Sequence, residues 1–158
     1  MFEVSVTEEH IKKAAALAEE LGELKNSITS GQGNLAGFLG EVIVAEMTGA
    51  NHSNTYDYDL LLPNGKSVDV KTKRTNYPPK GNYECSVAAF NTKQKCDFYA
   101  FVRVKNDLSC AWVLGFYDKT KYFRDAKFCK KGEYDPDNGF TFKADCYNIA
   151  INKLEGCP

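Results

Sequence analysis

Two aspartates and a lysine on either side of a short turn are the residues of this chain best suited to chemistry. Asp59 ends the segment YDYD, and Asp69 and Lys71 follow the turn at 63–65 within VDVKTK. If the two segments form a hairpin, alternation places Asp69, Lys71 and Lys73 on one face of the second strand. Asp59 is then within reach across the turn. Facing carboxylates repel unless a cation lies between them, so the pattern predicts a divalent-metal site beside a lysine, an arrangement suited to phosphate chemistry.

An acid, any residue and then a lysine is a weak pattern, and it occurs three times, at 23–25, 69–71 and 125–127. In the first copy, on a predicted helix, the two side chains point about 200° apart. The third lies in a polar segment typical of an exposed turn or helix end. Only the middle copy has a partner acid on a preceding strand. Asp57 shares the predicted face with Asp59, but Asp59 is nearer the turn and pairs better with Asp69.

Glu41 interrupts the apolar stretch GFLGEVIVAE, a costly placement if that helix is packed. It belongs either to the solvent-exposed stripe of the helix or to a functional site. A helix that packs its small residues against a sheet would aim Glu41 at Asp59 and Asp69. The three acids and Lys71 would then form one cluster.

Periodicity predicts a single α/β domain over residues 1–158, with a mixed sheet, the hairpin near its centre, and two N-terminal helices flanking it. The expected helices cover 7–25 and, from Leu35, a stretch ending near Gly49. The expected strands cover 56–62, 66–73, 84–90, 97–105 and 109–117, and 140–151 has strand-like composition. The apolar strands up to 117 predict a buried central sheet. Residues 118–132 are expected to form a short helix or an irregular crossover.

The chain has 158 residues and a formal charge of -1, so a nucleic-acid surface would require local segregation of charge. Two basic stripes meet that condition, residues 66–80 with five Lys or Arg against one acid, and residues 119–131 with six against one. Solvated surface charge is the alternative interpretation. The candidate backbone contacts are Lys73, Arg74, Lys93, Lys95, Lys121 and Arg124.

Six cysteines form no CxxC pair, and His10 and His52 are distant from them in sequence, which argues against a structural zinc site. The first ten residues lack the basic and apolar regions of a signal peptide, and no run reaches the length of a membrane span. We therefore expect a soluble cytoplasmic protein with reduced thiols and no membrane partner.

Four positions and their order resemble the PD-(D/E)XK nuclease superfamily, which includes restriction endonucleases. The family's helix glutamate corresponds to Glu41, its strand aspartate to Asp59, and its acid-x-lysine to Asp69 and Lys71. Tyr58 stands where the family has proline. The resemblance implies a restriction endonuclease-like fold with the catalytic hairpin.

The resemblance also implies a magnesium-dependent nuclease, with Mn²⁺ able to substitute, that hydrolyses phosphodiester bonds. DNA is the favoured substrate and internal cleavage is favoured over exonuclease action. The implied metal ligands are Glu41, Asp59, Asp69 and the Val70 carbonyl, with Lys71 orienting the nucleophile or stabilising charge. A homodimer would fit because two strands need two cuts.

Two other classes of protein fit the sequence. A nucleic-acid-binding module on the same fold would use its charges for grip and would bind without metal. An interaction protein with no nucleic-acid role would carry the same acids as solubility groups.

Overall fold

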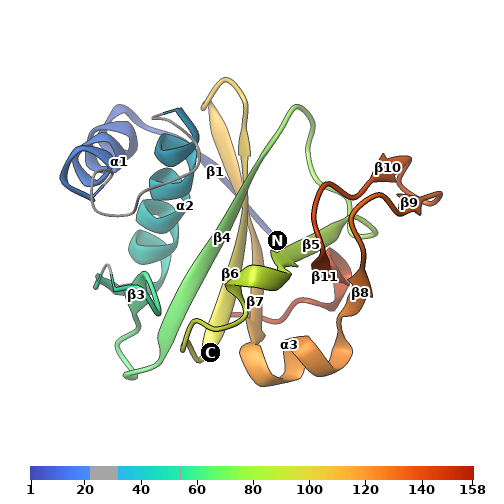
Figure 1. Ribbon diagram of the computed structural model, residues 1–158. Helices are drawn as coiled ribbons and strands as arrows, with labels where there is room; N and C mark the ends of the chain where they lie inside the picture. Colours follow the sequence, from blue (N-terminus) through green and yellow to red (C-terminus); the bar gives the residue numbers. More distant parts are fainter. Residues whose placement is uncertain (22–31, 54) are drawn as a thin grey trace.

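A computed structural model describes residues 1–21, 32–53 and 55–158 of the chain (Figure 1). Along the chain the elements are β1 (Phe2–Ser5), α1 (Glu8–Leu21), α2 (Gln32–Thr48), β2 (Asn51–His52), β3 (Leu60–Leu61), β4 (Ser67–Thr75), β5 (Glu84–Ala88), η1 (Ala89–Asn91), β6 (Phe98–Lys105), β7 (Cys110–Asp118), α3 (Lys119–Asp125), β8 (Lys127–Cys129), β9 (Tyr134–Asp135), β10 (Phe140–Thr141), β11 (Cys146–Ala150) and η2 (Ile151–Lys153).

The main sheet is mixed and six-stranded, in the order β1-β7-β6-β4-β3-β2. The pair β4 and β6 runs parallel, whereas the other neighbours in the described sheet are antiparallel. The mixed α/β class predicted from the sequence is thereby confirmed. In the predicted hairpin, β4 lies inside the sheet and β3 lies between it and the edge strand β2.

Helices α1 and α2 cover one face of the main sheet, with α2 between α1 and the strands (Figure 1). Apolar residues of α2, among them Leu39 and Ile43, pack against Val68 of β4 and Val102 of β6. The contact between α2 and β4 is very close at Gly40, where an added Cβ would collide with the Thr72 side chain. The close packing of this helix on the sheet, which its small residues predicted, therefore occurs at Gly40.

A second sheet, in the order β5-β11-β8, lies with α3 against the opposite face of the main sheet (Figure 1). The core between them is rich in aromatic rings, and Tyr122 of α3 lies at its centre. The Tyr122 hydroxyl donates to the carbonyl oxygens of Cys85 and Tyr147. A two-stranded ribbon of β9 and β10 extends beyond this sheet.

The structure differs from the sequence-based prediction in two strands. Residues 84–90 do not join the central sheet, because β5 pairs with β11 in the second sheet instead. The predicted strand 56–62 is reduced to Leu60–Leu61, since bends at residues 56, 57 and 59 interrupt the extended backbone before it. The turn between β3 and β4 is present, with Gly65 at φ 83° and its N–H donating to the Leu62 carbonyl.

The other predicted elements have described counterparts. Helix α1 covers most of the helix expected at 7–25, whose last residues, together with the acid-x-lysine copy at 23–25, lie outside the described residues. Residues 118–132 contain α3 and β8. Within the described residues, no helix combines the length and apolar character that a membrane crossing requires. All six cysteines are free thiols, and Cys85, Cys129 and Cys146 are buried.

Candidate active site

Asp69 and Lys71 form an ion pair on the face of β4 that is turned towards the second sheet. Lys71 Nζ lies 2.6 Å from Asp69 Oδ2, and the side chains are 19% and 5% exposed. The ammonium group also lies 5.8 Å from the centre of the Tyr99 ring and 3.4 Å from Gln94 Oε1. The placement of Asp69 and Lys71 on one face, predicted from alternation, is confirmed. A lysine and a carboxylate are thus held together in a largely dry environment, where their interaction is stronger than in water.

Backbone contacts on both sides fix the position of Asp59, which lies just before β3. Its N–H donates to the Val68 carbonyl at 3.0 Å, and its carbonyl accepts from the Ser53 N–H at 2.9 Å. Its carboxylate oxygen Oδ2 accepts a 2.8 Å hydrogen bond from the Val70 N–H. The buried Asp59 side chain therefore accepts a hydrogen bond from a backbone N–H of β4, just before the chain enters β3.

Asp57 makes different contacts from Asp59. Asp57 Oδ1 accepts a 2.9 Å hydrogen bond from the Lys95 N–H, so it anchors the loop before β6. The same loop is tied down by Gln94, whose Nε2 donates to the Tyr56 carbonyl at 2.9 Å. Because Gln94 also accepts from Lys71, this loop forms one wall of the site.

Glu41 is buried, so it does not belong to a solvent-exposed stripe of α2. Its Oε2 lies 3.9 Å from Nε2 of His52. His52 pairs with Leu60 in the β2–β3 ladder and so connects Glu41 to the residue that follows Asp59. Burial lowers the pKa of His52, which favours its neutral form. The sequence analysis gave His52 no role, and its place between two predicted site acids became visible only in the fold.

The three acids reach β4 from different sides. Asp69 points to the second sheet, Asp59 lies at the β3 edge, and Glu41 comes from the helical layer. Across residues 1–21, 32–53 and 55–158, no three His, Cys, Asp or Glu side chains are grouped so that they could hold a metal ion. The structure therefore does not gather the predicted ligands into one three-carboxylate cluster.

Two of the carboxylates do adjoin a single peptide unit. Asp69 precedes Val70 in the chain, and Asp59 binds the Val70 N–H. Because the N–H and C=O of one strand residue point the same way, the Val70 carbonyl is directed to the same β3 edge. Magnesium is commonly held by one or two carboxylates, with water and substrate phosphate completing six oxygens. The carboxylates of Asp59 and Asp69 and the Val70 carbonyl are oxygen ligands of the kind that magnesium binds.

Lys73 continues the polar stripe along the same face of β4, and the ladder places it beside Arg103 of β6. Arg103 is buried, and its Nη2 donates to the Glu84 carbonyl at 2.9 Å. Burial and then the charge of Arg103 lower the pKa of Lys73. Sequence reasoning proposed Lys73 and missed Arg103, although an arginine within the apolar strand FYAFVRVK is the same signal that identified Glu41.

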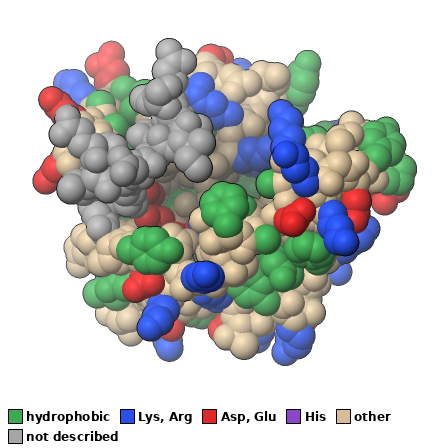
Figure 2. Space-filling view, viewed as in Figure 1, with side chains coloured by type: hydrophobic (Ala, Val, Ile, Leu, Met, Phe, Trp, Pro, Cys, Tyr) green, Lys and Arg blue, Asp and Glu red, His purple; other side chains and the backbone are tan. Residues whose placement is uncertain are grey.

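Three other predicted basic contacts lie on exposed positions. Arg74 is exposed on β4, and Lys93 and Lys95 are exposed on the loop that carries Gln94. In the view of Figure 2, several Lys and Arg side chains lie along the upper centre of the molecular surface. Their role in nucleic-acid binding stays a prediction.

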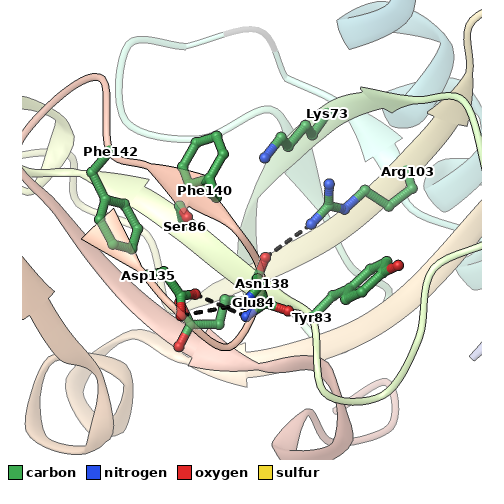
Figure 3. A pocket seen from close by; sticks show the side chains of 9 residues that line it. All are labelled: Lys73, Tyr83, Glu84, Ser86, Arg103, Asp135, Asn138, Phe140 and Phe142. Atoms are coloured by element: carbon green, nitrogen blue, oxygen red, sulfur yellow. Dashed lines mark hydrogen bonds between the residues drawn. The ribbon is translucent and has the colours of Figure 1, made fainter. Parts of the chain in front are cut away.

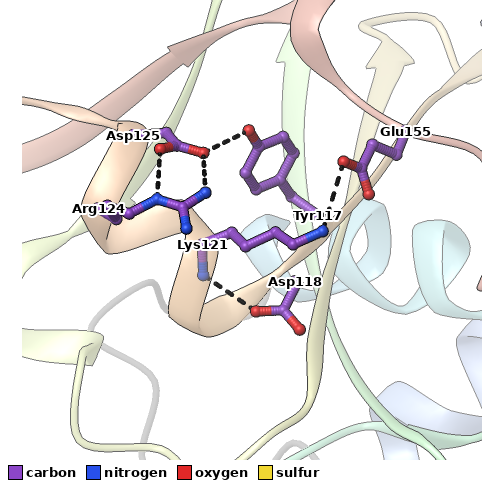
Figure 4. Close-up of polar contacts among 6 residues, drawn as sticks. All are labelled: Tyr117, Asp118, Lys121, Arg124, Asp125 and Glu155. Carbon is purple, nitrogen blue, oxygen red and sulfur yellow. Dashed lines mark hydrogen bonds and ion pairs between the residues drawn. The ribbon is translucent and has the colours of Figure 1, made fainter.

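Lys121 and Arg124 lie on α3, where local acids balance their charges (Figure 4). Arg124 Nε lies 2.9 Å from Asp125 Oδ1, and Lys121 Nζ lies 4.0 Å from Glu155 Oε1. Asp125 also accepts from the Tyr117 hydroxyl at 2.9 Å, and Asp118 caps the helix by accepting from the Lys121 N–H. The second basic stripe is therefore partly neutralised by its own surroundings, and its proposed contact with nucleic acid stays untested.

Comparisons with models of known protein families and with characterised proteins give no match for this chain. Any functional argument must therefore come from the residues of the site and their geometry.

Proposed function

We propose that this protein is a magnesium-dependent nuclease of the PD-(D/E)XK type that hydrolyses phosphodiester bonds within DNA. The observation that carries the proposal is the Asp69–Lys71 pair beside a Val70 peptide whose N–H is bound by the buried Asp59. Burying carboxylates is costly, and clustered buried charges mark functional sites more often than structural ones. The order of helix, short hairpin and parallel strand agrees with a restriction endonuclease-like fold.

Asp59, Asp69 and the Val70 carbonyl would hold the metal, with Glu41 completing the set directly or through water. Bound magnesium supplies Lewis-acid polarisation of the phosphate and a more acidic water; Mn²⁺ can substitute for it. The hydrogen bond from the Val70 N–H fixes one carboxylate oxygen of Asp59 beside the Val70 peptide.

Lys71 would act on the reacting phosphate through its ammonium group. Asp69 Oδ2 and Gln94 Oε1 contact this ammonium group and fix its position. A charged donor in a water-poor site stabilises the negative charge that develops as the phosphodiester is attacked. The exposed basic side chains of Arg74, Lys93 and Lys95 would contact the DNA backbone.

The experiment measures cleavage of linear, covalently closed circular and branched DNA with Mg²⁺, Mn²⁺ or EDTA. We expect cleavage with either metal, none with EDTA, and cutting of the closed circle, which requires an internal cut. Lys71→Met should slow cleavage by about 10²-fold or more, the loss seen when one charge-stabilising donor is removed. Asp69→Asn should lower the affinity for Mn²⁺ in calorimetry.

Lys12→Met is the matched control, because it also removes one lysine charge but from an exposed position on α1. It should cleave at the wild-type rate. Equal rates for wild type and Lys71→Met, or cleavage that persists in EDTA, would refute the assignment.

A binding module that does not cut is the second candidate. The absence of a three-ligand metal cluster from the described residues favours it, as does the direct contact of Lys71 with Asp69. This candidate predicts DNA affinity that EDTA leaves unchanged and no cleavage with any metal. The same assay therefore separates the two.

A further inference from the structure

A cavity of about 170 Å³ opens between the main sheet, at Lys73 and Arg103, and the β9–β10 ribbon (Figure 3). Its walls come from both sheets and from the segment between β9 and β11. The lining residues are Lys73, Tyr83, Glu84, Ser86, Arg103, Asp135, Asn138, Phe140 and Phe142. An apolar cavity of roughly 150 Å³ accepts benzene, so this one has room for one aromatic ring, and a larger ligand would extend out of its opening.

Two cations lie together at one end of the cavity. Arg103 is only 8% exposed, and its guanidinium donates a hydrogen bond to the uncharged carbonyl oxygen of Glu84. No carboxylate of the described chain lies within ion-pair distance of Arg103 or Lys73. The interior thus offsets little of the cost of removing the Arg103 guanidinium from water.

The positive charges at this end of the cavity repel one another. The pKa of Lys73 is lowered by burial first and then by Arg103, with Lys143 adding to the effect and the thiols of Cys85 and Cys146 opposing it. A group with negative charge placed between Lys73 and Arg103 would remove this repulsion. Arginine and lysine together form a strong site for phosphate oxygens.

Aromatic rings form a wall next to the cations. The Lys73 ammonium lies 5.1 Å from the centre of the Phe140 ring, and Phe140 meets Phe142 edge to face at 5.4 Å. Phe140 is 37% exposed, so part of it is accessible to a ligand. Stacking on such a ring is the sequence-tolerant way in which proteins hold an unpaired base.

The opposite end of the cavity is acidic, which sets the direction of a ligand. The Glu84 and Asp135 carboxylates lie there, and Asp135 Oδ2 accepts from Asn138 Nδ2 at 2.8 Å. Burial and then the charge of Asp135 raise the pKa of Glu84. A phosphate is repelled from this end, whereas the amino group of a base can donate to it.

We propose that the cavity binds one unstacked nucleotide of a single-stranded nucleic acid, with its phosphate between Lys73 and Arg103 and its base on Phe140. Lys73 follows Lys71 by two residues on the same face, a separation of about 7 Å along the strand. The bound nucleotide would therefore neighbour the phosphate at the Asp69–Lys71 pair. This inference rests on the proposed nuclease function and narrows its substrate to DNA with a single-stranded end, flap or gap.

The test is fluorescence anisotropy in EDTA, which prevents cleavage, with a labelled 12-nucleotide single strand and the blunt duplex of the same sequence. Phe140→Ala should weaken binding of the single strand about tenfold, the loss expected for one stacked base, and change duplex binding less. Lys73→Met should also weaken it, and the slope of log affinity against log salt should fall by about 0.7, the value of one phosphate contact on a single strand.

Lys12→Met is again the control with an equal charge change and should bind like the wild type. Phe140 and Lys73 are exposed, so their replacement leaves the core in place. Arg103 is buried, so it is replaced by lysine, which keeps the positive charge and removes the planar guanidinium. If Phe140→Ala and Lys73→Met bind the single strand as the wild type does, the cavity proposal is overturned, even when DNA is cleaved. If binding depends on the cavity but no DNA is cut with any metal, the nuclease proposal fails and the cavity proposal stands.

Discussion

Replacing Gly40 by alanine tests the close contact that positions α2, and with it Glu41, against β4. A Cβ at Gly40 would collide with Thr72 Oγ1 and lie 3.2 Å from Thr72 Cβ and 3.3 Å from Thr72 Cγ2. Overpacking of this kind costs about 1–3 kcal/mol. Alanine is favoured over glycine in a helix by about 1 kcal/mol, which offsets part of that cost. We expect a net loss of about 1 kcal/mol in the free energy of unfolding, or about 2–4 °C in Tm.

Gly37→Ala is the matched control, because it lies on the same helix and a Cβ there would meet nothing within 4 Å. It should keep the helical gain and raise the free energy of unfolding by up to about 1 kcal/mol. The two alanine variants should therefore move Tm in opposite directions, which thermal unfolding followed by circular dichroism measures directly.

Thr72→Ala provides the reciprocal test. Thr72 Oγ1 is buried and has no hydrogen-bond partner within the described residues, so removing it sacrifices no bond. In the double variant Gly40→Ala with Thr72→Ala, most of the lost stability should return, and a double-mutant cycle should give a coupling energy of about 1 kcal/mol. A Gly40→Ala protein as stable as Gly37→Ala, or a coupling energy near zero, would refute the packing argument. Cleavage by Gly40→Ala should also fall, because the shift moves the turn that carries Glu41.

The anchoring of Asp59 and the burial of the cysteines give two further tests. Asp59→Ala leaves the Val70 N–H without its charged acceptor and should lower the free energy of unfolding by about 1.5–3 kcal/mol in urea titrations, whereas Asp59→Asn keeps an acceptor oxygen and should lose less. Equal losses would mean that the hydrogen bond contributes nothing. Burial raises the pKa of the Cys85 thiol to about 12, so at pH 8 roughly one molecule in 10⁴ carries the reactive thiolate. In the native protein the exposed Cys157 should be alkylated well before Cys85, as peptide mass spectrometry would show, and rapid labelling of Cys85 without denaturant would contradict the observed packing.

The elements that sequence analysis located are those whose pattern is local. The apolar runs of β6 and β7 and the helical spacing in α2 each depend on a single segment, and the turn before β4 is marked by Gly65. The partners of a strand are not encoded in this way. Residues 84–88 look like a central strand, yet β5 pairs with β11, which lies about sixty residues further along the chain. Local periodicity gives a strand and its buried face, and only the whole fold determines which sheet it joins.

The same distinction holds within the site. Alternation placed Asp69 and Lys71 on one face because β4 is regular through these residues. It failed at Asp57 and Asp59, where the chain leaves the strand and backbone hydrogen bonds decide the direction of each carboxylate. Glu41 was identified because a charge within an apolar helix requires an explanation. The contacts of His52 could not be predicted, because they depend on a two-residue edge strand.

The stripe along β4 changes character from one end to the other, and this change decides which ligand it suits. At Asp69 the positive charge of Lys71 is matched by a carboxylate at 2.6 Å, so this end is close to neutral and can accept a cation. At Lys73 and Arg103 no acid of the described chain forms an ion pair, so the other end attracts anions. A metal alone would suit only the first end, and a free phosphate only the second. A polymer that brings successive phosphates, one beside a metal and the next between two cations, would use both ends at once, and this correspondence supports the proposal that the ligand is a nucleic-acid strand.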